Sequence, residues 1–240
     1  MVRNNNNLKK RVADRSLALW DFDKKQIDKN EFLIGVDEVG RGCLAGDVVA
    51  AAVMVPRSFY EKKEFQKICL GIVDSKQIDF SKRQKMDSVI RSLQQEGDCR
   101  FQLAASNVSE IENLNIVGAT SLAMQRCLDK LIDGYKPEDL KVIVDGRPMK
   151  RLSTQHDGVV KGDGKSLVIA MASILAKVYR DQTMVELSKL YPDYGFCQHK
   201  GYGTPQHLRA LREKGVVEGI HRPRFLNKII TCDRQLEFDF

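Results

Sequence analysis

The sequence lacks the cysteine and histidine spacing of zinc and redox sites. None of its six cysteines belongs to a CxxC pair, and no histidine lies at metal-finger spacing from two of them. The polar N-terminus has no apolar signal core, and the longest apolar stretch, residues 167–176, has about half the length that spans a bilayer. These absences predict free thiols in a reducing cytoplasm and no membrane association.

The composition is that of a globular protein with a modest basic excess. The chain has 240 residues, 42% of them hydrophobic and 30% charged, with a formal net charge of +7. That length suits one large domain or one domain with appendages. The basic excess is compatible with a polyanionic partner but is weak evidence by itself. It is most pronounced in residues 200–228, where seven Lys or Arg face two Glu.

Hydrophobic periodicity predicts an α/β domain. Short apolar runs without a helical period predict buried strands at residues 32–36, 48–55, 101–105 and 142–144. A glycine-rich turn at 40–46 separates the first two strands. An apolar stretch at 167–178, rich in Ala and Ser, predicts a central helix packed on several neighbours. Strands followed by alternating helices and strands indicate a mixed sheet with flanking helices. Residues 1–30 are predicted to be a flexible or partly helical appendage.

Two further helices are predicted from their caps and apolar stripes. Ser81 is the expected cap of one, which has Met86, Val89, Ile90 and Leu93 on one face. The other is expected to start at a capping box of Ser109 and Glu112 and to run to about Asp133. Its expected apolar face carries Val117, Met124, Leu128 and Leu131.

Two strands end in acidic residues. Residues 34–36 lead into Asp37 and Glu38, and residues 142–144 lead into Asp145. An acid at the carboxyl end of a strand is a common way to present a carboxylate at the rim of an α/β sheet, although strand-terminating acids without function are also common. Asp163 precedes the central helix, where an acid is also favoured by the helix dipole. Sequence spacing alone does not bring the four acids together.

If the four acids converge, their chemistry is constrained. Clustered carboxylates repel one another and raise each other's pKa, and divalent cations relieve this repulsion. Oxygen ligands without His or Cys suit Mg²⁺ or Mn²⁺, and two such ions can support phosphodiester hydrolysis. Adjacent strand residues face opposite sides of a sheet. We therefore expect the first strand to end at or immediately after Asp37, so that Glu38 reaches the same site.

At this point the residues match a known family. Residues 37–42, Asp-Glu-Val-Gly-Arg-Gly, resemble the DExGRG signature of ribonuclease HII. The resemblance continues in order over about residues 32–226, through the segments 44–53, 74–76, 144–146, 161–181 and 191–204. It implies a ribonuclease H-like fold, with a mixed central sheet, flanking helices and a helical C-terminal region.

The resemblance also implies an activity and a set of site residues. It implies cleavage of RNA in RNA–DNA hybrids and incision 5′ of ribonucleotides embedded in duplex DNA, leaving 3′-hydroxyl and 5′-phosphate ends. It implies that the Gly-Arg-Gly turn reads the ribose 2′-hydroxyl, the group that separates RNA from DNA, and that a tyrosine stacks on the next deoxyribose. The implied metal ligands are Asp37, Glu38, Asp145 and Asp163, and the implied substrate-binding residues are Gly40, Arg41, Gly42, Tyr202, Lys76, Lys177 and Lys200.

Three positions depart from the family pattern. Cys43 and Asp47 stand where proline is usual, which could loosen the turn slightly because proline fixes φ. Met171 stands where alanine is preferred and suggests a compensated packing change. None of the proposed ligands is changed, so these departures are not expected to abolish activity.

The predicted organisation has three parts: a polar extension at 1–30, a catalytic domain with its helical C-terminal region at 31–226, and a tail at 227–240. The last residues, Gln235–Phe240, resemble the short peptides that dock on bacterial sliding clamps, and less closely the clamp-binding box of archaeal and eukaryotic proteins. A frayed or self-packed tail is the alternative. The protein is expected to be a monomer.

Three other functions fit parts of the sequence. Ribonuclease HIII, which needs longer RNA tracts, is disfavoured by Arg41, because that family typically lacks this arginine. A non-catalytic hybrid-binding protein is disfavoured by the four acids, which would weaken binding to a polyanion. A recombination nuclease or integrase of the same fold would not need the Gly-Arg-Gly turn or the Tyr202 segment.

Overall fold

The structure is a computed structural model that describes residues 2–72 and 79–226, with the backbone alone for residues 2–12. Its centre is a five-stranded sheet in the order β3-β2-β1-β4-β5. β1 pairs antiparallel with β2 and parallel with β4, so the predicted mixed sheet is confirmed. The strands are β1 (Phe32–Val39), β2 (Val48–Pro56), β3 (Arg100–Ser106), β4 (Leu140–Asp145) and β5 (Asp157–Val159).

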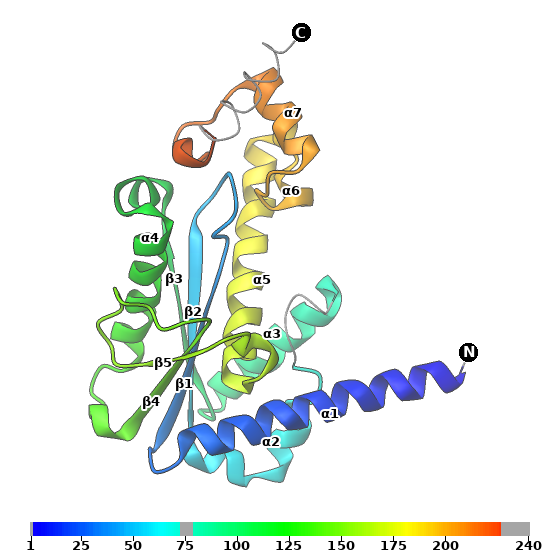
Figure 1. The fold of residues 1–240 in the computed structure, drawn as a ribbon. Helices are drawn as coiled ribbons and strands as arrows, with labels where there is room; N and C mark the ends of the chain where they lie inside the picture. The colour runs from blue at the N-terminus through cyan, green and yellow to red at the C-terminus, as the bar shows by residue number, and fades with distance from the viewer. Residues whose placement is uncertain (1, 73–78, 227–240) are drawn as a thin grey trace.

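Helices cover both faces of the sheet. In Figure 1, α4 lies against one face and the long α5 against the other, with α6 and α7 near the C-terminal end of α5. Among the described residues, no helix is both long and apolar enough to cross a bilayer. The helices are α1 (Val2–Ile27), α2 (Lys63–Ile68), α3 (Phe80–Gln95), α4 (Val108–Leu131), α5 (Leu167–Leu190), α6 (Phe196–His199) and α7 (Pro205–Lys214).

β1 is buried on both faces, which explains its continuous apolar sequence. Leu33 points into the core on the α5 side, whereas Ile34 and Val36 point into the core on the α4 side. Between them, Gly35 allows α5 to approach the sheet, because a Cβ at this position would lie 2.5 Å from the carbonyl carbon of Val168. The start of α5 is therefore pressed directly onto β1.

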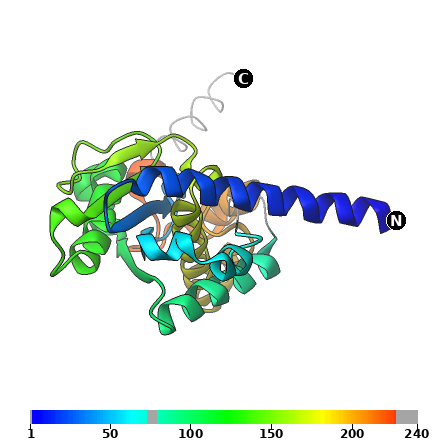
Figure 2. The same ribbon diagram turned by 90° about the horizontal axis from the view of Figure 1, so that it is seen from below.

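The N-terminal segment forms one long helix, α1, where a flexible or partly helical appendage was predicted. Figure 2 shows that its first half projects away from the body of the molecule. Its second half joins the main core: Leu19, Trp20 and Ile27 are buried, and the Trp20 ring packs against both Phe59 and Tyr60 at centroid distances of 5.4 and 5.0 Å. The predicted boundary at residue 30 stays a prediction, and the tail at 227–240 lies outside the described residues.

Two predicted helix caps are wrong. α3 is capped by Asp79, whose carboxylate accepts from the Lys82 amide at 2.9 Å, and not by Ser81. α4 starts at a capping box formed by Asn107 and Glu110, two residues earlier than the predicted box of Ser109 and Glu112. In both cases an Asp or Asn side chain just upstream reaches the free amides first.

One residue of the predicted apolar face of α4 is also misplaced. Met124, Leu128 and Leu131 are fully buried, as predicted, but Val117 is 47% exposed. Asn115, with φ 59° and ψ 170°, interrupts the helix and changes its direction. Val117 therefore does not continue the buried stripe that lies further along the helix.

Candidate active site

Three of the four predicted acids lie together at one end of the sheet. One carboxylate oxygen from each of Asp37, Asp145 and Asp163 lies within 4.8 Å of the other two. Asp37 and Asp145 are brought side by side because β1 and β4 are parallel neighbours, with Val36 paired to Val144. Asp163 comes from a short 3-10 turn (Gly162–Gly164) immediately before α5.

The surroundings of Asp37 disfavour its negative charge. Asp37 and Asp163 are only 3% and 6% exposed. Burial raises the pKa of Asp37 well above its usual value, and the nearby charges of Glu38 and Asp145 raise it further, against a hydrogen bond from Ser173 that lowers it. A cation between the carboxylates would reverse this balance.

The donor set fits a hard divalent cation. The three acids Asp37, Asp145 and Asp163 offer carboxylate oxygens only, which suit Mg²⁺ or Mn²⁺. Two backbone amides fix the carboxylates: the Glu38 amide donates to Asp37 Oδ1 at 2.7 Å, and the Gly162 amide donates to Asp145 Oδ1 at 2.6 Å.

Glu38 lies apart from this group, and the expectation that the first strand ends at or just after Asp37 is wrong. β1 continues to Val39, which pairs with Val49. Because the strand stays pleated, Glu38 faces the opposite side of the sheet from Asp37 and forms an ion pair with Arg41 at 3.0 Å. The assignment of Glu38 as a metal ligand therefore stays a prediction.

Glu38 and Asp145 line a pocket of about 450 Å³ that opens beside the acids. Arg41 lines it as well, together with a basic loop that follows β4 and contributes Arg147, Lys150 and Arg151. Cations thus outnumber acids around this pocket, which suits a polyanionic strand passing the carboxylates.

The buried guanidinium of Arg222 binds the backbone of the turn at 40–47. This side chain donates to the carbonyl oxygens of Gly40 at 2.8 Å, Cys43 at 3.0 Å and Gly46 at 2.8 and 2.5 Å. Burial lowers the pKa of Arg222 to about 10, so the group still carries its charge at neutral pH. These bonds turn the carbonyls of the turn inward.

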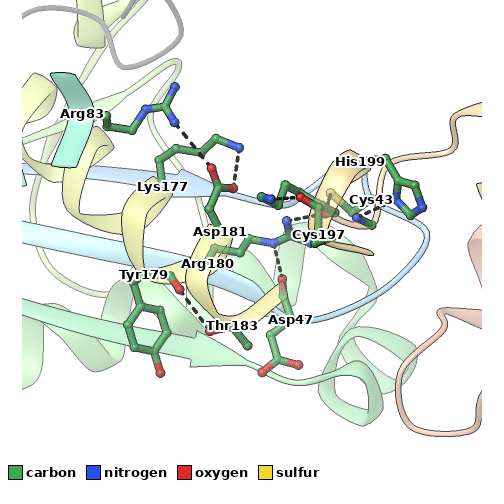
Figure 3. A network of polar contacts seen from close by, with 12 residues as sticks. Cys43, Asp47, Arg83, Lys177, Tyr179, Arg180, Asp181, Thr183, Cys197 and His199 are labelled. Carbon is green, nitrogen blue, oxygen red and sulfur yellow. Dashed lines mark hydrogen bonds and ion pairs between the residues drawn. The ribbon is translucent and has the colours of Figure 1, made fainter. Parts of the chain in front are cut away.

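A second buried arginine, Arg180 of α5, completes the support (Figure 3). It donates to the carbonyl oxygens of Ala45 and Asp47, both at 3.0 Å, and to that of Lys200 at 2.8 Å. Gly40 is required here, because it has φ +92° and a Cβ would lie 2.2 Å from Arg180 Nε. The two positions without the usual proline, Cys43 and Asp47, therefore lie in a turn that is fixed by arginines.

Tyr202 lies beside this turn, and the predicted lysines differ in their contacts. Tyr202 is 41% exposed, and Lys177 Nζ lies 6.0 Å from the centroid of its ring. Lys177 also pairs with Asp181 at 2.7 Å, and Lys200 Nζ bonds to the carbonyl of Cys197 (Figure 3). Lys76 lies outside the described residues, so the phosphate-binding roles of the three lysines stay predictions.

Sequence reasoning assigned no role to Arg180 or Arg222. Both act on backbone carbonyls, which every residue type carries, so no sequence pattern marks their partners. The sequence showed only that both arginines lie within the stretch, about residues 32–226, that resembles the family.

The fold and the site together define a metal-dependent hydrolase of the ribonuclease H fold. The sequence model of the family described as Ribonuclease HII matches residues 34–228. A ribonuclease HII of Fusobacterium nucleatum subsp. nucleatum is 42% identical over 231 residues, which cover 95% of this chain and 98% of that protein. A ribonuclease HII of Hydrogenovibrio crunogenus is 45% identical over 193 residues, which cover 80% of this chain and 85% of that protein. The chain belongs to the ribonuclease HII family and is a metal-dependent ribonuclease H, an endonuclease that acts on RNA–DNA hybrids.

Solved structures share the fold. The ribonuclease H2 of Pyrococcus horikoshii OT3 superposes with a TM-score of 0.65 at 23% identity, covering 85% of this chain and 99% of that one. The ribonuclease HII in a complex with PCNA from Archaeoglobus fulgidus superposes with a TM-score of 0.60 at 22% identity, covering 79% and 93%. Bst-RNase HIII, solved in complex with Mn²⁺, gives 0.60 at 21% identity, covering 83% and 68%.

Proposed function

We propose that this enzyme incises 5′ of ribonucleotides embedded in duplex DNA, as well as cleaving RNA in RNA–DNA hybrids, by two-metal-ion phosphodiester hydrolysis that leaves 3′-hydroxyl and 5′-phosphate ends. The observation that carries the proposal is the placement of the carboxylates Asp37, Asp145 and Asp163 beside the braced turn at 40–47 and Tyr202. The carboxylates can bind the reacting phosphate through metal ions, and the turn with Tyr202 can distinguish a ribose from a deoxyribose beside it.

The acids supply the metal ligands in this proposal. Asp37, Asp145 and Asp163 would hold Mg²⁺ or Mn²⁺, with Glu38 contributing from the pocket side. Divalent cations bound there would supply positive charge to activate a water and to stabilise the leaving oxygen. The burial of Asp37 and Asp163 keeps bulk water away, so the electrostatic interactions in the site are strong.

The turn supplies the choice of substrate. Since Arg180 and Arg222 bind its carbonyl oxygens, the amides of Gly40, Arg41 and Gly42 are the backbone groups available to bind a 2′-hydroxyl. Gly42 has open space where a Cβ would stand, so a ribose can approach its backbone closely. Tyr202 offers an exposed ring face for the following deoxyribose.

The incision assay tests the activity directly. A duplex with one ribonucleotide is incubated with wild-type protein, Asp37→Asn or Asp145→Asn, in Mg²⁺ or Mn²⁺. The wild type should incise 5′ of the ribonucleotide, and both variants should lose roughly 1,000-fold or more of kcat, as removal of an electrostatic catalytic group does. Asp133→Asn, an exposed acid at the end of α4, is the control and should match the wild type. A duplex left intact by the wild type under both metals would show that the assignment is wrong.

The length of RNA that the enzyme requires distinguishes a ribonuclease HII-like from a ribonuclease HIII-like specificity. Comparison of one embedded ribonucleotide with a run of four should show efficient incision of both. Cleavage of only the run of four would instead indicate a ribonuclease HIII-like specificity.

The tail and the assembly state complete the proposal. The archaeal relative in complex with PCNA makes a clamp a reasonable partner, and we propose that Gln235–Phe240, which lies outside the described residues, docks on a bacterial sliding clamp. Titration of purified clamp with a tail peptide should give saturable binding, and no binding at high micromolar concentration would remove this partner. The enzyme is proposed to act as a monomer in the cytoplasm, where its chromosomal substrate lies.

A further inference from the structure

One acid of the N-terminal helix is buried next to the active site without a place in the proposed chemistry. Asp23 of α1 has no exposed surface. Its Oδ2 accepts from the Tyr60 hydroxyl at 3.0 Å and from the amide of Val168, 145 residues later in the chain, at 2.9 Å. It lies outside residues 34–228, which match the family.

Asp23 binds the first turn of α5. Ser166 is the N-cap of this helix, and its hydroxyl accepts from the Ile169 amide at 3.3 Å. The Asp23 carboxylate accepts from Val168, a second free amide of the same turn, and a negative charge at this place is favoured by the helix dipole. A side chain from α1 thus caps the Val168 amide, in addition to the Ile169 amide that Ser166 caps.

The start of α5 is connected directly to two of the three clustered acids. The amides of Lys165 and Ser166 donate to the carbonyl oxygen of Gly162 at 2.9 and 2.8 Å, which closes the turn that carries Asp163. The amide of Gly162 donates to Asp145 at 2.6 Å. A shift of the first turn of α5 would therefore move Asp163 and release Asp145.

The same helix also reaches the third acid. Ser173, two turns further along α5, hydrogen-bonds to Asp37, and the α5 backbone at Val168 lies against Gly35 of β1 without room for a Cβ. The relative position of Asp37 and Asp163 is thus set by how the first turns of α5 sit on β1.

The environment of Asp23 is unfavourable for a residue that only contributes to stability. Burial raises the pKa of Asp23 to about 7, against opposing hydrogen bonds from Ser166, Val168 and Tyr60. Its Oδ1 is buried and lacks a hydrogen bond of ordinary geometry within the described part of the chain. Burying a carboxyl group at this cost calls for an explanation.

We propose that Asp23 is a positioning residue for the metal site: by holding the first turn of α5, it fixes Asp163 relative to Asp37 and Asp145. The N-terminal helix is then a functional part of the enzyme. The inference rests on the proposed metal-binding function of these three acids.

The test compares full-length wild type with Asp23→Ala, Asp23→Asn and Asp21→Ala. Asp21 lies on the same helix but is exposed, so Asp21→Ala is the matched control. Three quantities are measured for each protein. They are the Mn²⁺ affinity by calorimetry, kcat and KM on an RNA–DNA hybrid, and the midpoint of thermal unfolding.

In Asp23→Ala, Mn²⁺ affinity and kcat should each fall roughly 10-fold, the loss typical of residues that orient metal ligands, while KM for the hybrid stays within about twofold. Asp23→Asn keeps an acceptor for the Val168 amide and should recover most of both. Asp21→Ala should match the wild type.

The inference is overturned if Asp23→Ala binds Mn²⁺ and turns over like Asp21→Ala, whatever its thermal midpoint. If Asp23→Ala does not fold, Tyr60→Phe removes only the hydroxyl that anchors the carboxylate. It should weaken Mn²⁺ binding roughly threefold, the effect of losing one hydrogen bond, and unchanged binding would overturn the inference. A wild type that neither binds Mn²⁺ nor cleaves would instead refute the proposed function, and the inference with it.

Discussion

Asp145 takes part in both halves of the site, since it belongs to the carboxylate group and lines the cation-rich pocket. Its charge contributes to the raised pKa of Asp37. In Asp145→Asn this repulsion disappears, so in EDTA the variant should be more stable than the wild type, with a thermal midpoint higher by about 2–4 °C for each kcal/mol relieved. Mn²⁺ should then stabilise the wild type but not the variant.

Scanning calorimetry with EDTA and with Mn²⁺ checks this expectation. Asp133→Asn serves as the control and should behave like the wild type in both conditions. A lower midpoint of Asp145→Asn in EDTA would show that the Gly162–Asp145 hydrogen bond outweighs the repulsion.

At the scale of elements, the turn at 40–47 depends on the shape of a guanidinium. Lysine at position 222 would keep the charge but could not reach the carbonyls of Gly40, Cys43 and Gly46 together. Arg222→Lys should therefore lower kcat/KM at a single embedded ribonucleotide roughly 10-fold more than at an RNA–DNA hybrid, a difference of about 1.4 kcal/mol. Arg224→Lys, an exposed position nearby, is the control. Equal losses on both substrates would contradict a role of the turn in recognition.

The basic loop after β4 should act on binding rather than on chemistry. Replacement of Arg147 and Lys150 by alanine should raise KM, leave kcat close to that of the wild type, and reduce the slope of log affinity against log salt by about 2, one for each lost phosphate contact. Binding to a duplex in Ca²⁺ at several salt concentrations measures this slope. An unchanged slope would mean that the loop does not touch the substrate backbone.

Elements with strong local patterns could be predicted from the sequence, and elements made by distant contacts could not. The strands at 32–36, 48–55, 101–105 and 142–144 and the start of α5 at Leu167 follow from apolar runs. The three-residue β5 has no periodicity to detect. The packing of α1 depends on Trp20 meeting Phe59 and Tyr60, which a polar N-terminal sequence does not reveal.

The site shows the same division. The positions of Asp37, Asp145 and Asp163 are given by family motifs, and the parallel pairing of β1 with β4 brings the first two together. The direction of Glu38 depends on whether β1 continues past it, which pairing with β2 decides. Asp23, Arg180 and Arg222 act on backbone groups, which have no sequence pattern.

At the scale of the whole molecule, the C-terminal region is built on a buried cluster of three of the four histidines. The rings of His199 and His207 stack at 4.4 Å, and Nε2 of His207 lies 3.1 Å from Nε2 of His221. His207 also bonds to the carbonyl of Tyr202, and the charge of Lys200 lowers the pKa of His199. Burial lowers the pKa of all three histidines, that of His207 to about 4.

This cluster should make the enzyme sensitive to acid. Between about pH 4 and 6.5 the unfolded chain binds protons that folded His207 does not, so the free energy of unfolding should fall as the pH drops through this range, by at most about 3 kcal/mol, and level off above it. Asp23, whose pKa is raised to about 7, has the opposite effect, because the folded state binds its proton more tightly than the unfolded chain does. The contribution of His207 is therefore isolated by comparing the wild type with His207→Gln, in which Asp23 is unchanged. The free energy of unfolding is measured by urea titration at several pH values from 4.5 to 7.5. It should change less steeply with pH in His207→Gln than in the wild type. Identical slopes would exclude His207 as the cause.

One helix, α5, connects every part of the site. Ser173 contacts Asp37 and Arg180 binds the turn, and these two residues, seven positions apart on α5, are separated by about 10.5 Å along the helix at 1.5 Å per residue. A helix packed on a sheet does not stretch, so in the proposed function α5 fixes the distance between the sugar that the turn recognises and the bond that is cut. An enzyme built in this way has one fixed cleavage offset, and a single residue inserted between Ser173 and Arg180 would turn the two ends about 100° out of phase.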